Sequence, residues 1–382
     1  MLFNISIFLY IFLLFNREFV PFIDLRLVIL PLFLLLILQK IYTLSMKKTI
    51  VVFGKRKYIT LFILFISIIA ISNIKWLFNP YFPNEDVRTN IMILYMYNFT
   101  AIMVFSLYWN KLNLEIFSKI ILFSGFILFL SMIAQVAGID DLPFAGQVRG
   151  STDDELSLFG FRVGGYAEDQ NYATFSMIIW FLVGSIFIKN KTLVSLLFIL
   201  SFIGILLSFS KTIILATFII LSFIVAKKLK LLVPYVLFST VFVGFAAIYL
   251  FEVMQSLSTM SIRFKMWEVA FESFINNFLF GSGTSSVRSN FLYQGFWYVQ
   301  PHNSFVALSH DSGIFAVSIY IFIFLMLFKL ENIYYKVMLW MLLFLSLTQE
   351  LFVFQYPYFV LGILPILMLI KQNNIYLTKI RI

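Results

Sequence analysis

Both histidines of this 382-residue chain, His302 and His310, lie in one short stretch, YVQPHNSFVALSHDSGIF (298–315). The chain has no cysteine, which excludes disulfides, thiolate catalysis and zinc–thiolate sites. An imidazole, with an ordinary pKa of about 6.5, can accept a proton near neutral pH. His302 is therefore a candidate general base, although it could instead cap a helix or lie among lipid headgroups. His310 is expected to be hydrogen-bonded inside a helical bundle or to support Asp311.

Three basic side chains in polar segments could hold an anion. They are Arg162 before a Gly-Gly turn, Arg263 within SIRFKMWEVAFESF (261–274) and Lys211 within SFSKTII (208–214). A guanidinium grips phosphate or carboxylate through two parallel hydrogen bonds, whereas an ammonium acts as a point charge. The structural alternatives are ion pairs of the two arginines with nearby acids (Glu168, Asp169 and Glu268) and extension of the lysine to the headgroups.

The elements that must position these residues are membrane-spanning helices. The chain is 62% hydrophobic and 12% charged, and its apolar runs reach about 18 residues or more, the length that crosses a bilayer. They predict an all-α integral membrane protein with about twelve transmembrane helices. The predicted spans are residues 2–15, 25–46, 58–78, 91–109, 114–137, 170–188, 192–208, 212–226, 231–251, 304–328, 333–349 and 353–370. The first run lacks a basic start and a cleavage site, so it is predicted as a short span and not as a signal peptide.

Basic residues are divided unequally between the two sides of this topology. Alternation of the spans places 18 of the 28 Lys and Arg residues on one side, with only two of the 18 acids, Glu115 and Glu331. Because short connections rich in Lys and Arg stay inside the cell, this side and both termini are predicted to be cytoplasmic. Seven of the other ten basic residues are arginine, which makes the outer face the candidate working face. This distribution of basic residues is explained by membrane topology and argues against binding of nucleic acid.

Two long polar segments, 138–169 and 252–303, are predicted outside the membrane, within a single polytopic domain that covers 1–382. In the second segment, Arg263, Trp267 and Phe271 recur at helical spacing, which predicts an amphipathic surface helix. The Gly/Ser-rich sequence FGSGTSS (280–286) follows and predicts a turn in preference to a phosphate cradle. The histidine stretch comes next, so most of the candidate groups are predicted to lie on one face.

The order and spacing of these residues resemble the bacterial superfamily of O-antigen polymerases and O-antigen ligases, which are integral membrane glycosyltransferases. The resemblance covers residues 159–315 and, through the number of spans, the whole chain. The matching residues are Arg162, Gly165, Asn171, Ser210, Lys211, Arg263, Trp267, Gly281, Gly283, His302, Asn303, Asp311 and Gly313. Two positions depart from the family pattern: Lys211 replaces an arginine, which favours a polymerase, and Asp311 replaces a glutamate.

The resemblance implies that a glycan on undecaprenyl diphosphate is transferred to a sugar hydroxyl, without a nucleotide sugar, metal or other cofactor. Negative charge accumulates on the diphosphate as the anomeric bond breaks, so catalysis needs fixed cations there and a base at the attacking hydroxyl. The candidates for the cations are Arg162, Arg263 and Lys211, and the candidate base is His302. The predicted supporting residues are Asn303, Asp311, Asn171, Glu168, Asp169 and His310.

The sequence therefore predicts an enzyme that polymerises lipid-linked repeats into O-antigen or capsule-like polysaccharide, on the periplasmic face of the bacterial inner membrane. Its predicted partners are the lipid-linked donor and acceptor, membrane lipid and a chain-length regulator. One alternative is an O-antigen ligase with a lipid A core acceptor. Others are a lipid-linked oligosaccharide flippase or transporter, and a non-catalytic scaffold. Transporters carry repeated halves and ionisable groups near the midplane, whereas this sequence shows no clear repeat and has two unequal outer segments.

Overall fold

A computed structural model describes most of the membrane-embedded helices and parts of their connections. The described residues are 2–17, 19, 25–46, 57–77, 85–108, 111–139, 141–142, 146–147, 163–167, 170–208, 210, 213, 258–283, 292–293, 296–297, 303–348, 355–368 and 370–371. The predicted spans 212–226 and 231–251 lie outside this set except for Ile213, as does most of the outer segment 138–169.

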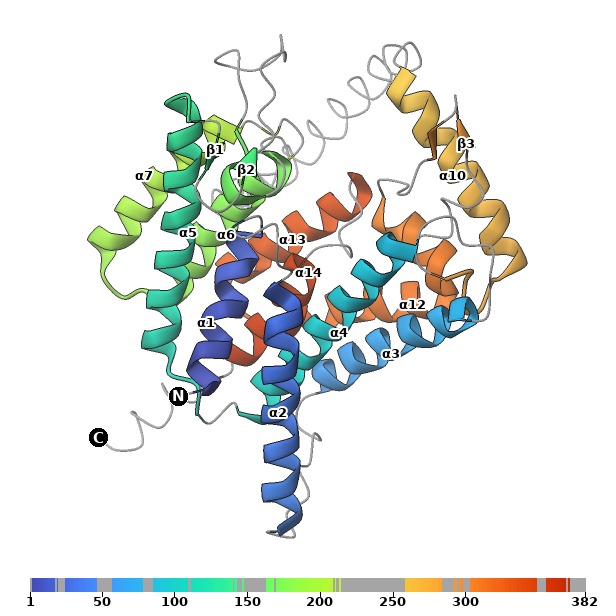
Figure 1. Cartoon of the computed structure of the whole chain (residues 1–382), viewed down its shortest axis with the longest axis horizontal. Coiled ribbons are helices and arrows are strands. Elements are labelled where there is room, and N and C mark those ends of the chain that lie inside the picture. The colour runs from blue at the N-terminus through green and yellow to red at the C-terminus, as the bar shows by residue number, and fades with distance from the viewer. Residues whose placement is uncertain are drawn as a thin grey trace, which may run out of the picture.

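The described part of the chain is predominantly helical, which confirms the all-α part of the predicted fold class (Figure 1). The helices are α1 (Leu2–Phe15), α2 (Leu25–Met46), α3 (Lys57–Leu77), α4 (Glu85–Leu107), α5 (Leu114–Val136), α6 (Gln170–Phe187), α7 (Lys191–Ser208), α10 (Ser258–Asn276), α12 (Ser304–Leu327), α13 (Ile333–Thr348) and the short α14 (Tyr356–Tyr358). Two antiparallel hairpins occur in the connections, β1 (Asp141–Leu142) with β2 (Gly146–Gln147), and β3 (Leu292–Tyr293) with β4 (Phe296–Trp297).

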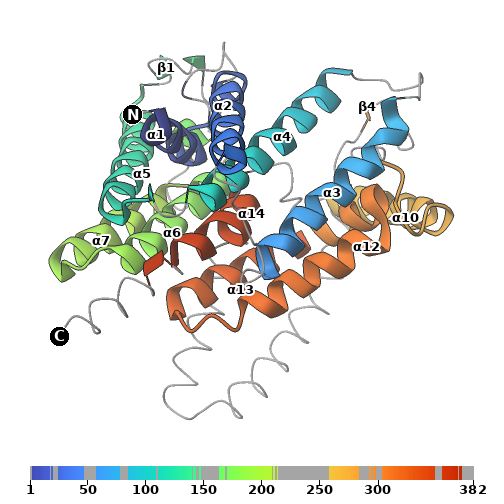
Figure 2. The ribbon, with the colours of Figure 1, turned by 90° about the horizontal axis from the view of Figure 1, so that it is seen from below.

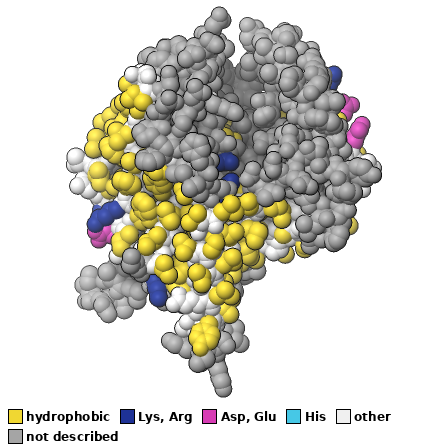
Figure 3. Space-filling view, in the orientation of Figure 1, with side chains coloured by type: hydrophobic (Ala, Val, Ile, Leu, Met, Phe, Trp, Pro, Cys, Tyr) yellow, Lys and Arg dark blue, Asp and Glu magenta, His cyan; other side chains and the backbone are white. Residues whose placement is uncertain are grey.

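Five of these helices are long and apolar enough to cross a membrane. The qualifying segments are Leu25–Thr43, Leu114–Val136, Gln170–Phe187, Lys191–Ser208 and Ser304–Leu327. Helix α7 shows why they need lipid, because Phe198 and Phe202 on it are about half exposed. Apolar side chains also cover much of the described surface in Figure 3. A contiguous apolar exterior of this kind is stable in a bilayer and not in water.

The helix directions agree with alternating passage through the membrane. Helices α6 and α7 form an antiparallel hairpin in which the Thr174 and Ser208 hydroxyls lie 2.7 Å apart. Helices α12 and α13 are also antiparallel, because the Asn303 amide at the start of α12 donates to the Leu347 carbonyl near the end of α13 at 3.0 Å. Figures 1 and 2 show α1, α5, α6 and α7 grouped on one side of the molecule and α3, α10 and α12 on the other.

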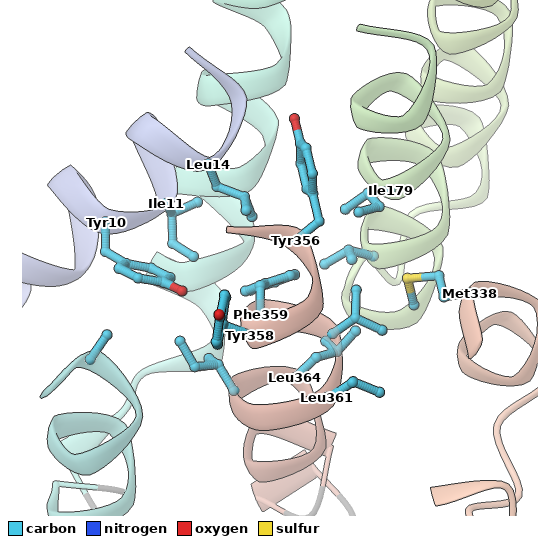
Figure 4. Packing of buried hydrophobic residues seen from close by; sticks show 14 of the residues in the cluster. Tyr10, Ile11, Leu14, Ile179, Met338, Tyr356, Tyr358, Phe359, Leu361 and Leu364 are labelled. Atoms are coloured by element: carbon cyan, nitrogen blue, oxygen red, sulfur yellow. The ribbon is translucent and has the colours of Figure 1, made fainter. Parts of the chain in front are cut away.

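The C-terminal helix lies between these groups and forms the centre of the core. It begins with α14, continues through a π-helical turn (η5, Phe359–Ile363) and is buried at every described residue up to Ile370. Figure 4 shows Tyr358 and Phe359 packed among side chains of α1, α6 and α13, including Tyr10, Ile179 and Met338. A π turn disturbs helical hydrogen bonding, and the Tyr335 hydroxyl donates to the Val360 carbonyl at 2.9 Å within it. This helix fixes the scaffold on which the candidate site is built.

Candidate active site

Helix α12 is interrupted at Gly313, whose backbone has φ 74° and ψ −174°. Glycine adopts this positive φ at little steric cost. The break removes regular helical partners from nearby backbone groups. The carbonyls of His310 and Asp311 instead accept hydrogen bonds from the backbone N–H groups of Ser282, at 2.8 Å, and Gly283, at 2.9 Å. The broken helix is therefore completed by a segment about 30 residues earlier in the chain.

That segment follows α10 and approaches α12 backbone to backbone. The Ile314 N–H donates to the Phe278 carbonyl at 2.9 Å. A Cβ atom at Gly281 would lie 2.3 Å from the Asp311 carbonyl carbon, and one at Gly313 would lie 2.3 Å from the Leu279 carbonyl oxygen. We refer to segments 278–283 and 310–314 together as the glycine interlock. The predicted Gly/Ser turn thus joins α10 to the break in α12.

The interlock encloses an imidazole–carboxylate pair. His310 Nδ1 lies 2.7 Å from Asp311 Oδ1, and both residues are buried. Ionisable groups inside a membrane protein are costly and commonly functional. The contact is the one expected of a histidine that supports Asp311.

Asn303 fixes the start of α12. Its side-chain oxygen accepts from the backbone N–H groups of Phe305, at 2.9 Å, and Val306, at 3.1 Å, as in an N-cap. Its amide nitrogen donates to Leu347 on α13. The oxygen of the Asn303 amide therefore caps α12 and its nitrogen links α12 to α13, so Asn303 positions the start of α12.

A second polar group lies where α6 begins and α7 ends. The Ser210 hydroxyl donates to the Asn171 side-chain oxygen at 2.6 Å, and the Ser210 N–H donates to the Thr174 hydroxyl at 3.3 Å. The Val163 N–H donates to the Leu207 carbonyl at 3.2 Å. Two of the predicted family residues, Asn171 and Ser210, are thus in direct contact although they are 39 positions apart.

A turn before α6 packs onto the end of α5. The Gly165 N–H donates to Gln135 Oε1 at 2.7 Å, and the Tyr166 N–H donates to the Ser131 hydroxyl at 3.1 Å. Burial raises the pKa of the Tyr166 hydroxyl above its ordinary value. Sequence reasoning missed Ser131 and Gln135, although two polar residues four apart in an apolar run share a helix face.

Several predicted site residues fall outside the described set. These are His302, Arg162, Lys211, Glu168 and Asp169, and for Arg263 the backbone in α10 is described but the side chain is not. Their roles therefore stay predictions. The structure brings the described candidates into two groups, one at the ends of α6 and α7 and one on α10 and α12.

The fold and these polar groups define a multi-pass helical membrane protein with a broken helix at its candidate site. Residues 196–321 match the family described as O-antigen ligase, a range that includes Ser210, α10 and the whole glycine interlock. The match confirms the resemblance to the superfamily of O-antigen ligases and polymerases that was found in the sequence. The match leaves the choice between the two activities to experiment. No curated protein matches the chain.

Proposed function

We propose that the protein is a metal-independent glycosyltransferase that polymerises undecaprenyl-diphosphate-linked repeats into O-antigen or capsule-like polysaccharide. The observation that carries this proposal is the family match over 196–321, which coincides with the broken helix that holds His310 and Asp311. In the proposed topology about twelve spans cross the bacterial inner membrane, both termini are cytoplasmic, and segments 138–169 and 252–303 face the periplasm. A chain-length regulator is a proposed partner.

In the proposed mechanism, His302 takes the proton from the attacking sugar hydroxyl. It directly precedes Asn303, whose cap and link to α13 would hold the entry to α12 steady. Asp311, which is bonded to His310, lies further along α12, just before the break at Gly313. A base held on a rigid element is effective because proton transfer depends on geometry as well as pKa.

The proposed diphosphate clamp consists of Arg162, Arg263 and Lys211, with Glu168 and Asp169 as nearby acids that orient them. Two of these residues adjoin described contacts: Arg162 precedes Val163, and Lys211 follows Ser210. Contacts of Val163 with Leu207 and of Ser210 with Asn171 tie these two chain segments together. Fixed cations in such an arrangement would stabilise the charge that develops on the leaving diphosphate.

The main test separates polymerase from ligase, the second candidate, which the description of the matched family favours. The purified protein in lipid nanodiscs is given undecaprenyl-diphosphate-linked repeats alone. A polymerase produces a ladder of longer glycans, whereas a ligase forms product only after lipid A core is added. A strain that lacks the protein should, for a polymerase, carry surface material with one repeat. Product that depends on the core, or an unchanged ladder in the deletion strain, would reject the polymerase.

The clamp predicts that charge alone is insufficient at the arginines. Arg162→Lys and Arg263→Lys should each lower polymer formation by about 10- to 100-fold, because an ammonium cannot replace two charge-assisted hydrogen bonds. Lys211→Arg should be tolerated, since it restores the residue of the family pattern. The measurement is the initial rate of ladder formation at matched protein levels. Normal rates in both lysine variants would make the arginines structural residues.

The topology predicts opposite labelling at the two membrane faces. The chain has no native cysteine, so single cysteines report cleanly. Glu272 on α10 and Lys119 on α5 are both exposed. Glu272→Cys should react with an impermeant maleimide in intact spheroplasts, and Lys119→Cys only after permeabilisation. Reversed labelling would place α10 in the cytoplasm and remove the periplasmic site.

A further inference from the structure

An apolar groove lies between α1, α5 and the start of α2. Its volume is about 320 Å³, and it is lined by Phe8, Leu9, Phe12, Phe19, Leu25, Phe123 and Ile127. Phe12 is 7% exposed and Phe123 is 48% exposed, so the groove has a buried floor and an open edge. All of its lining residues are apolar, and four are phenylalanine. We call it the phenylalanine groove.

One end of the phenylalanine groove adjoins the candidate site. The ring of Phe19 packs edge-on against Tyr166, with centroids 5.1 Å apart. Tyr166 belongs to the turn Gly165–Ala167, which α5 holds through Ser131 and Gln135. This turn comes directly after the segment that carries Arg162. A ligand that runs along the groove would therefore leave it beside Tyr166, four positions after Arg162 in the sequence.

Two further arginines are near neighbours in the sequence of Phe19 and Leu25, which line the groove. Arg17 lies in the turn after α1, two positions before Phe19, and Arg26 follows Leu25 in the first turn of α2. Both side chains are partly exposed. An apolar channel with guanidinium groups at one end is complementary to a lipid with an anionic head.

We propose that the phenylalanine groove holds the isoprene units nearest the diphosphate of the lipid-linked glycan, with Arg17 and Arg26 near that diphosphate. This inference rests on the proposed function and extends it, because it assigns the lipid part of the substrate to α1, α2 and α5. These helices lie outside the segment that matches the family. The aromatic lining suits a branched, unsaturated chain, and two extra guanidinium groups suit a diphosphate more than the single phosphate of a phospholipid.

The test is photo-crosslinking of the full-length protein in phosphatidylglycerol liposomes, with undecaprenyl diphosphate that carries a diazirine on its chain. Label is expected in peptides that contain Phe8 to Phe12 and Phe123 to Ile127. Unlabelled undecaprenyl diphosphate should compete, and additional phosphatidylglycerol should not. Ile127→Trp, which fills the groove, should lower labelling by about tenfold, the low end of the effect of one misfit group in an apolar pocket.

Matched variants separate the groove from general surface effects. Leu130→Trp adds the same ring on α5, at a position that is 45% exposed and not part of the lining, and should label as the wild type does. Arg26→Gln should weaken labelling by the diphosphate probe but not by a diazirine-bearing undecaprenol. Equal labelling of Ile127→Trp and Leu130→Trp, or competition by phosphatidylglycerol, would show that the groove does not bind the isoprenoid. Ladder formation by the wild type would still support the proposed function in that case. Labelling of the groove without ladder formation would retain the groove and reject the polymerase.

Discussion

A His302→Gln variant is expected to lose chain elongation by about 10² to 10⁴-fold, the usual contribution of a general base. Glutamine can hold the acceptor hydroxyl by hydrogen bonding, but it cannot accept its proton. The variant should still bind the lipid-linked donor, because the proposed clamp is unchanged. The measurements are the initial rate of ladder formation and the retention of donor on the purified protein.

His310→Gln is the matched control for this prediction. His310 is buried and bonded to Asp311, and a glutamine amide can still donate to that carboxylate. Its loss should be about tenfold or less, well below that of His302→Gln. If His302→Gln is as active as the wild type, the base must instead be sought among Glu168, Asp169 and Asp311.

The helices could be predicted from sequence because their signal is local. Apolar runs placed α1 and α2 with the bounds that the structure shows, and α5 and α12 within one residue. The predicted span 91–109 agrees with the apolar part of α4, Met92–Leu107, although the helix itself begins earlier, at Glu85. The acidic residues Glu85 and Asp86 end an apolar run but are favoured at the start of a helix.

The tertiary contacts of the candidate site could not be predicted in the same way. Gly281 and Gly313 are 32 positions apart, and nothing in either local sequence specifies that their backbones meet. The interruption of α12 is also not specified by hydropathy, because Gly313 and the polar residues Ser309 to Ser312 before it lie inside the single predicted span 304–328. Motif order did bring Asn171 and Ser210 into one candidate set, and their contact gives that grouping a physical basis. The order of motifs in the sequence identified these residues, whereas their contact partners could be identified only from the three-dimensional structure.

The conformation of the glycine interlock depends on hydrogen bonds between its two segments and not on the local sequence of either segment alone. Segment 278–283 satisfies backbone groups that the break in α12 leaves without helical partners, and α12 does the same for Phe278. Unsatisfied backbone groups are costly in an apolar environment, so each segment stabilises the other. The buried His310–Asp311 pair lies within the contact. The interlock therefore links the position of α10, which carries Arg263, to the helix that follows His302.

Replacing Gly313 with alanine is expected to open this interlock and lower polymer formation by about 10²-fold, the effect of misplacing a catalytic group by about 1 Å. The new Cβ would meet the Leu279 carbonyl oxygen at 2.3 Å, a backbone atom that cannot move aside without displacing α10. Gly281→Ala should behave alike, because its Cβ would meet the Asp311 backbone. Both variants should also unfold at lower temperature in detergent.

Gly138→Ala provides the control that separates strain from contact. Gly138 also has a positive φ, 79°, but a Cβ there would meet nothing within 4 Å. It should therefore carry only the conformational penalty of alanine in this region, about 1–2 kcal/mol, and keep most of its activity. The measurements are ladder formation and melting temperature for all three variants. If Gly313→Ala and Gly138→Ala lose activity equally, backbone strain alone explains the effect, and the interlock has no special part in positioning the site.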